Sequence, residues 1–197
     1  MKRMILVAAA LLCLLGTAAA QRHIEYKWRG PYFTIDGSYL MNLNREAGLN
    51  GRADTLGAVN LSMSAGFQFS KEAGVGIGIT YISDPTGAFT QMPAYIELRS
   101  HFMRSRLTPY TVLQGGYCLP LGSSSAPPRV EITKGGLYFG ASVGARYAID
   151  RSFAIGLHVD YRLLQSAVVT RYDMHNTPEI ADPLAFHTVG GGLTMYF

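Results

Sequence analysis

Apolar and polar residues alternate with a period of two along most of the chain after Gly30. The alternation recurs in stretches of about ten residues that are separated by turn-forming residues, which is the pattern of β-strands. No apolar run after Gln21 reaches the roughly 20 residues of a membrane-spanning helix. The pattern predicts eight strands: Tyr32–Leu43, Leu56–Phe69, Val75–Ile82, Met92–Met103, Pro109–Leu119, Gly136–Ile149, Ser152–Leu164 and Ala185–Phe197.

The connections between these predicted strands alternate in length. Three of them are short turns: Ser70–Gly74, Arg104–Thr108 and Asp150–Arg151. Four of them are long loops: Asn44–Thr55, Ser83–Gln91, Pro120–Gly135 and Gln165–Leu184. Short turns at one end and long loops at the other are typical of an outer-membrane β-barrel, in which the short turns are periplasmic.

The two faces of the predicted strands differ in chemistry. One face is apolar, as in Val59, Leu61 and Met63, while the other holds six charged residues: Asp36, Glu97, Arg99, Arg146, Asp160 and Arg162. A soluble barrel would turn this second face to water. Only 15% of the residues are charged, whereas a soluble surface usually has roughly 25–35%. The pattern therefore predicts an all-β, eight-stranded, antiparallel up-and-down transmembrane barrel with an apolar exterior and a polar lumen.

Aromatic residues on the apolar face gather near both ends of the strands. Those near the short turns are Phe33, Phe67, Phe69, Phe102, Tyr147, Phe153 and Phe197. Those near the long loops are Tyr39, Tyr81, Tyr117, Phe139 and Tyr161. Two aromatic belts around an aliphatic band are expected where a barrel crosses the two membrane–water boundaries.

The first residues predict export from the cytoplasm. Lys2 and Arg3 precede an apolar stretch of 11 residues, Ile5–Leu15, and small residues follow at Ala18–Ala20. This is the pattern of a cleaved signal peptide over residues 1–20, with the cut before Gln21. We expect residues 21–30 to form a short periplasmic segment and residues 31–197 to form the barrel domain in the bacterial outer membrane.

Loss of the signal peptide lowers the formal net charge from +4 to +2. A charge this small does not favour nucleic acid as a partner. Cys118 is then the remaining cysteine, so no internal disulfide is expected in an oxidising compartment.

The six charged residues of the polar face sum to zero. Eight strands enclose an interior that side chains fill, and an unpaired charge there is costly. We therefore predict a salt-bridge network that joins the fourth, sixth and seventh strands and closes the lumen. Six lumen-facing glycines would leave room for the long side chains: Gly76, Gly78, Gly116, Gly140, Gly144 and Gly156.

Other groupings carry weaker signals. The glycines of Gly74–Gly78 lie within a strand and lack the helix of a nucleotide-binding motif. His158 and Asp160 share the lumen face, where an ion-pair network explains them as well as catalysis does. Four loop residues, Asp173, His175, Glu179 and Asp182, match no metal-ligand spacing. We predict no catalytic residue, metal or cofactor.

The last predicted strand ends on Phe197, with Met195, Leu193 and Val189 alternating behind it. This ending resembles the closing strand of outer-membrane barrels. With the signal peptide and the strand pattern, the mature chain resembles the small OmpA/OmpX-like barrels, including the outer-membrane β-barrel domain of Bacteroidetes. The resemblance implies that Phe197 is an assembly signal, read by the barrel-assembly machinery.

Three functions fit these observations. The first is a non-enzymatic barrel with a structural or surface-interaction role, which contacts outer-membrane lipid and other envelope proteins through its four long loops. The second is an accessory subunit of a secretion or conjugation machine. The third is a lipid-modifying enzyme, for which His187 is the lipid-facing histidine near the outer rim and lacks an evident partner.

Overall fold

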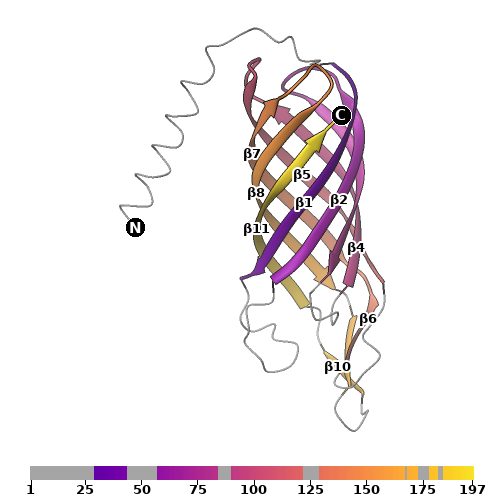
Figure 1. Cartoon of the computed structure of the whole chain (residues 1–197). Coiled ribbons are helices and arrows are strands. Elements are labelled where there is room, and N and C mark those ends of the chain that lie inside the picture. Colours follow the sequence, from indigo (N-terminus) through magenta and orange to yellow (C-terminus); the bar gives the residue numbers. More distant parts are fainter. Residues whose placement is uncertain are drawn as a thin grey trace, which may run out of the picture.

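The computed structural model describes residues 29–43, 57–83, 90–121, 129–166, 168–172, 178–181 and 184–197. Eight antiparallel strands form a closed barrel in the order β1-β11-β8-β7-β5-β4-β3-β2 (Figure 1). The barrel strands are β1 Gly30–Asn42, β2 Gly57–Gln68, β3 Gly74–Ser83, β4 Thr90–His101, β5 Leu107–Pro120, β7 Leu137–Ala148, β8 Ala154–Ser166 and β11 Leu184–Tyr196. None of the described residues belongs to a helix long and apolar enough to cross a membrane.

The predicted fold class is confirmed, because each predicted strand overlaps one barrel strand and the barrel is closed. The strand ends differ by a few residues; the predicted Ser152–Leu164, for example, is β8, Ala154–Ser166. The predicted signal peptide, residues 1–20, and residues 21–28 of the leading segment lie outside the described residues.

The barrel closes where the last strand pairs with the first. The β1–β11 register runs from Thr34 opposite Tyr196 to Asn42 opposite Thr188. Beyond it, the backbone N–H of Phe33 donates to the oxygen of Phe197 at 3.1 Å, and that of Phe197 donates to Phe33 at 2.9 Å. This seam leaves no barrel strand with an unpaired edge, which removes the usual site of edge-to-edge aggregation.

The outward side chains form a continuous apolar surface. Ile77 is 68% exposed and Leu157 is 67% exposed, and their neighbours on the same face are also aliphatic. Soluble monomers seldom show apolar patches larger than a few hundred Å². An apolar band that encircles a closed barrel therefore fits the hydrocarbon core of a bilayer, and the backbone groups inside it are satisfied by the strand ladder.

Aromatic rings border this band as predicted. At the short-turn end the ring centroid of Phe197 lies 6.2 Å from that of Phe33 and 5.4 Å from that of Phe153. At the long-loop end Tyr39 and Tyr117 are about half exposed. Both sets face outward, where a membrane–water boundary accommodates their amphipathic rings.

Two of the predicted long loops contain short strands that the alternation pattern does not predict. β6 Arg129–Lys134, β9 Val168–Tyr172 and β10 Pro178–Ala181 form a separate sheet in the order β10-β9-β6. Figure 1 shows β6 and β10 beyond the long-loop end of the barrel. A local signal was present, since Val130 and Ile132 alternate with polar residues and β9 begins with two valines, but the segments are short for a membrane-spanning strand.

Candidate functional site

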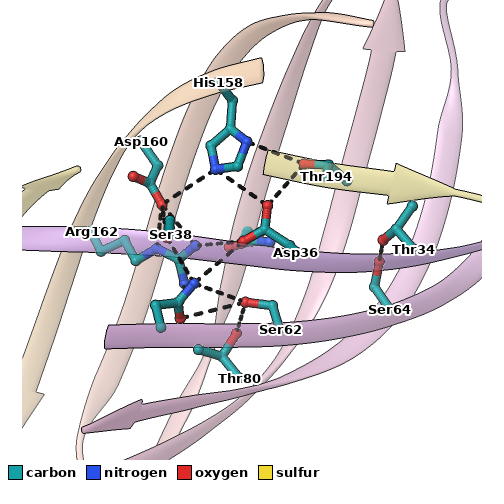
Figure 2. A network of polar contacts seen from close by, with 12 residues as sticks. Thr34, Asp36, Ser38, Ser62, Ser64, Thr80, His158, Asp160, Arg162 and Thr194 are labelled. Carbon is teal, nitrogen blue, oxygen red and sulfur yellow. Dashed lines mark hydrogen bonds and ion pairs between the residues drawn. The ribbon is translucent and has the colours of Figure 1, made fainter. Parts of the chain in front are cut away.

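The inward side chains fill the barrel in layers. Near the long loops lies a layer that we call the outer apolar layer, formed by Leu40, Ile82, Tyr95, Cys118, Tyr138, Leu164 and Phe186, all buried. Between this layer and the short-turn end lies a polar network, part of which is drawn in Figure 2. Cationic side chains gather at the short-turn end. Each layer follows from the period of two, which sends alternate residues of every strand to the lumen.

Arg162 on β8 is the centre of the polar network. Its Nε and Nη2 lie 2.9 and 2.8 Å from Oδ2 of Asp160 on the same strand, two residues away. Its Nη1 donates to Oδ1 of Asn60 at 2.9 Å and to the hydroxyl of Tyr138 at 3.2 Å. Arg162 is 2% exposed and Asp160 is 1% exposed. The planar guanidinium thus ties β8 to β2 and β7 with charge-assisted hydrogen bonds.

Asp36 on β1 joins the same network from the other side of β11. Its Oδ1 lies 3.7 Å from Nη2 of Arg162, and its Oδ2 accepts a hydrogen bond from the Thr194 hydroxyl at 2.9 Å. The ring of His158 bridges this region, with Nε2 3.2 Å from Oδ2 of Asp36 and Nδ1 3.1 Å from Thr194 (Figure 2). The network therefore connects β1, β8 and β11 across the seam where the barrel closes.

Small polar side chains continue the network toward β3. The amide nitrogen of Asn60 donates to the hydroxyl of Ser38 at 2.9 Å, and Ser38 donates to Asp160 at 3.1 Å. The hydroxyls of Ser62 and Thr80 lie 2.7 Å apart. These residues compensate for the lost hydration of the charged groups, because a buried polar group without a partner is costly.

A second polar cluster surrounds Glu97 on β4, which is fully buried. Its Oε1 accepts hydrogen bonds from Tyr32 at 2.7 Å, from Ser64 at 3.0 Å and from Arg99 Nη2 at 3.0 Å. The guanidinium of Arg99 lies 5.0 Å from the centroids of the Tyr32 and Tyr196 rings, within the range of cation–π attraction.

Arg146 on β7 lies nearer the short turns than either cluster. Its Nη1 is 3.1 Å from Nε2 of His101, and its guanidinium carbon is 5.4 Å from the centroid of Tyr196. The structure therefore brings all six predicted charged residues to the lumen. It places four of them as pairs within single strands: Glu97 with Arg99 on β4, and Asp160 with Arg162 on β8.

The pairing differs in detail from the prediction. A network joining the fourth, sixth and seventh strands was expected, whereas the described ion pairs of Arg162 are with Asp160 on its own strand and with Asp36 on β1, and the Glu97–Arg99 pair stays on β4. Residues two apart on one strand share a face, so a close pair within a strand needs no neighbouring strand. Hydroxyl and amide side chains surround these pairs, as is expected for buried charges, and Asn60 lies on the polar face of its strand.

The layers leave little open space in the middle of the barrel. The cavity among the polar residues has a volume of about 20 Å³, and one water molecule needs about 10–15 Å³ by this measure. His158 and Asp160 are 3.9 Å apart, yet a substrate has no room beside them. The arrangement can hold the barrel wall together, and the cavity within it has room for only one or two water molecules.

The outer apolar layer includes a tyrosine, Tyr95, that packs closely against a glycine, Gly78. A Cβ atom at Gly78 would lie 2.6 Å from both Cζ and Oη of Tyr95, whose ring packs 5.7 Å from that of Tyr138. Gly78→Ala is expected to destabilise the barrel by about 1–3 kcal/mol, because a methyl group overpacks a filled layer. Urea unfolding in micelles measures this. Gly115→Ala, at a glycine with nothing within 4 Å, is the control, and equal losses in both variants would contradict the prediction.

His187 faces outward near the long loops, and the structure supplies a partner that the sequence did not indicate. Its Nδ1 lies 2.6 Å from the hydroxyl of Tyr161 on the neighbouring strand. In the described part of the chain, this ring contacts a phenol and no serine, cysteine or carboxylate. The loop residues Asp173, His175 and Asp182 lie outside the described residues, as does the side chain of Glu179.

Comparisons with known proteins agree in fold. No protein-family model matches the chain, and no curated protein matches its sequence. Its structure is similar to that of Neisserial surface protein A from Neisseria, with a TM-score of 0.56 and 15% identity over 85% of this chain and 97% of that one. It is also similar to the outer membrane protein OprG from Pseudomonas aeruginosa, with a TM-score of 0.57 and 12% identity over 89% of this chain and 99% of that one. The chain therefore has the fold of a small, eight-stranded outer-membrane β-barrel, with an apolar exterior and a polar lumen.

Proposed function

We propose that the protein is a non-enzymatic barrel of the bacterial outer membrane, with a closed lumen and a surface-interaction role at its long-loop end. The observation that carries this proposal is the filled interior. A cavity of about 20 Å³ lies on the short-turn side of the outer apolar layer. Conduction needs a continuous polar path, and a layer of buried aliphatic and aromatic side chains opposes one. Exposed loops on a rigid scaffold are the usual place for binding.

The second sheet supports a role at the long-loop end. β6 and β9 come from different connections of the barrel and pair with each other over Arg129–Lys134 and Val168–Tyr172. A ladder between two connections fixes their backbones relative to each other and presents them beyond the barrel (Figure 1). Its outer edges, β6 and β10, are places where another strand can add.

We infer export through the predicted signal peptide, contact with outer-membrane lipid, and recognition of Phe197, which lies at the closing seam, by the barrel-assembly machinery. The first alternative is an accessory subunit of an envelope secretion or conjugation machine. The second is a lipid-modifying enzyme, for which the outward His187–Tyr161 contact is the candidate. A histidine bound to a phenol, with no nucleophile aligned to it among the described residues, supports this poorly.

In-cell cross-linking tests the surface role. An affinity tag inserted between β3 and β4 leaves the second sheet intact, and captured material from outer membranes is identified by mass spectrometry. We expect an envelope or external partner in stoichiometric yield from the unmodified loops. A double variant, Val130→Pro with Ile132→Pro, is the matched control, because proline cannot donate to a strand ladder, and it should lose the partner while the barrel still folds.

Each outcome of this experiment separates the candidate functions. If the protein with unmodified loops and the double proline variant both capture a large machine component, the accessory-subunit alternative is favoured. Recovery of the barrel alone from both would contradict the surface-interaction role and direct attention to lipid analysis around His187.

A further inference from the structure

A cavity at the short-turn end of the barrel is separate in chemistry from the polar network. Its volume is about 100 Å³, which is room for several water molecules or a group such as phosphate. Five cationic or protonatable side chains line it, and no Asp or Glu side chain is among its described lining residues: Arg29, Arg99, His101, Arg146 and Arg151. We call it the turn-side cavity.

These side chains come from four separate parts of the chain. Arg99 and His101 lie on β4 and Arg146 on β7, and all three are at least nine-tenths buried. Arg29 precedes β1, and Arg151 lies in the turn before β8; both are exposed. The cavity therefore has a buried cationic floor and an exposed cationic rim, and long arginine side chains at a surface can reach toward a bound group.

The described negative groups around the cavity already have partners. Glu97 pairs with Nη2 of Arg99 from the lumen side at 3.0 Å. Asp150 accepts a hydrogen bond from the backbone N–H of Arg151 at 2.6 Å, and a main-chain oxygen of Phe197 accepts one from Phe33 at 3.1 Å. At the adjoining turn, Glu72 pairs with Lys71 at 3.0 Å. Among the described residues, positive charge thus exceeds negative charge at this mouth.

Arg99 also has hydrogen-bonding capacity that the described residues do not use. It is 5% exposed, and its Nε and Nη1 donate no hydrogen bond to any described residue. The rings of Tyr32 and Tyr196, each 5.0 Å away, hold the guanidinium in place. A fixed guanidinium with unused donors suits an oxyanion, because its planar fork matches two oxygens at once.

We propose that the turn-side cavity binds a phosphate group from the periplasmic side, with Arg99 and Arg146 as its floor and Arg29 and Arg151 as its rim. This proposal is independent of the surface role at the opposite end. Buried cations cost free energy that a bound anion offsets. The phosphate comes either from solution or from a phospholipid headgroup, since the cavity opens beside the aromatic belt that includes Phe33 and Phe197.

The test uses the full mature chain, folded in a sugar-based detergent that contains no phosphate. Inorganic phosphate is titrated by calorimetry at constant ionic strength, against chloride, because exposed charges are screened by salt. We expect saturable phosphate binding that Arg146→Gln weakens about tenfold or more, since a charge-assisted hydrogen bond is lost. Arg146 is buried, so a double variant, Arg29→Gln with Arg151→Gln, tests the same site through exposed residues, where substitutions usually change stability little.

Arg104→Gln is the matched control, because Arg104 is an exposed cation of a short turn and does not line the cavity. It should bind phosphate as the unmodified protein does. Absence of saturable binding to the unmodified protein would overturn the proposal. Equal weakening by Arg104→Gln and by the rim variant would overturn it too, because general attraction to a basic surface would then be sufficient.

Two lipid environments distinguish the sources of the phosphate. The titration is repeated in nanodiscs of phosphatidylglycerol and in nanodiscs of a galactolipid without phosphate. If inorganic phosphate binds only in the galactolipid discs, the headgroup is the natural occupant. If it binds equally in both, the site takes free phosphate.

Discussion

Replacing Arg162 with methionine is expected to destabilise the barrel by about 3–5 kcal/mol, the typical cost of removing one partner of a buried ion pair. Asp160, at 1% exposure, would lose the two contacts near 2.9 Å that Arg162 provides. Asn60 and Tyr138 would each lose a partner as well. Urea unfolding followed by circular dichroism measures the loss, and a gel assay of heat-induced unfolding should show conversion at lower temperature.

Two further variants decide whether the loss comes from the buried charge. Adding Asp160→Asn to Arg162→Met should recover part of the stability, because one uncompensated carboxylate is then neutral. Arg151→Met, at an exposed turn, should change the stability by no more than about 0.5 kcal/mol. A loss below about 1 kcal/mol in Arg162→Met would mean that the network does not hold the barrel closed.

Replacing Val159 with arginine is expected to cost about 2–4 kcal/mol in a bilayer, the range for a cation on the lipid face near the membrane midplane. Val159 lies midway along β8, is 57% exposed and pairs with Val143 and Gly191. On a soluble barrel the same exposed change would alter the stability by about 0.5 kcal/mol or less. Reversible unfolding in lipid vesicles measures the difference.

Gln165→Arg is the matched control for this prediction. Gln165 lies on the same strand and the same outward face but at the long-loop end of β8, where an arginine costs about 0–1 kcal/mol. A depth-dependent loss would support the membrane-spanning reading of the exterior. Equal and small effects at both positions would contradict it.

Arg162 and Val159 lie on opposite faces of the barrel wall, Arg162 toward the lumen and Val159 toward lipid. An arginine is required at position 162 and costly at position 159, although the two residues are three positions apart on β8. The lumen holds a charge among partners with fixed geometry, while lipid offers none. A closed interior and an apolar exterior together leave the two ends of the barrel as the places for specific contacts.

Alternation with a period of two determined much of this protein from the sequence alone. It predicted which residues face inward, so Asp36, Glu97 and Arg162 were assigned to the lumen before any contact was known. The alternation of short and long connections predicted the closed antiparallel barrel. Both are local properties, because a strand's side chains alternate whatever its neighbours are.

Only the tertiary structure decided which residues meet. The contact of Arg162 with Asp36 links β8 to β1 across β11, and the turn-side cavity gathers Arg29 with Arg151. Such contacts depend on strand tilt and stagger, which the closure of the whole barrel sets. The β6–β9 ladder between two connections likewise needs both barrel strands in place. The sequence therefore determined the direction of each side chain, while the closed barrel determined its partners.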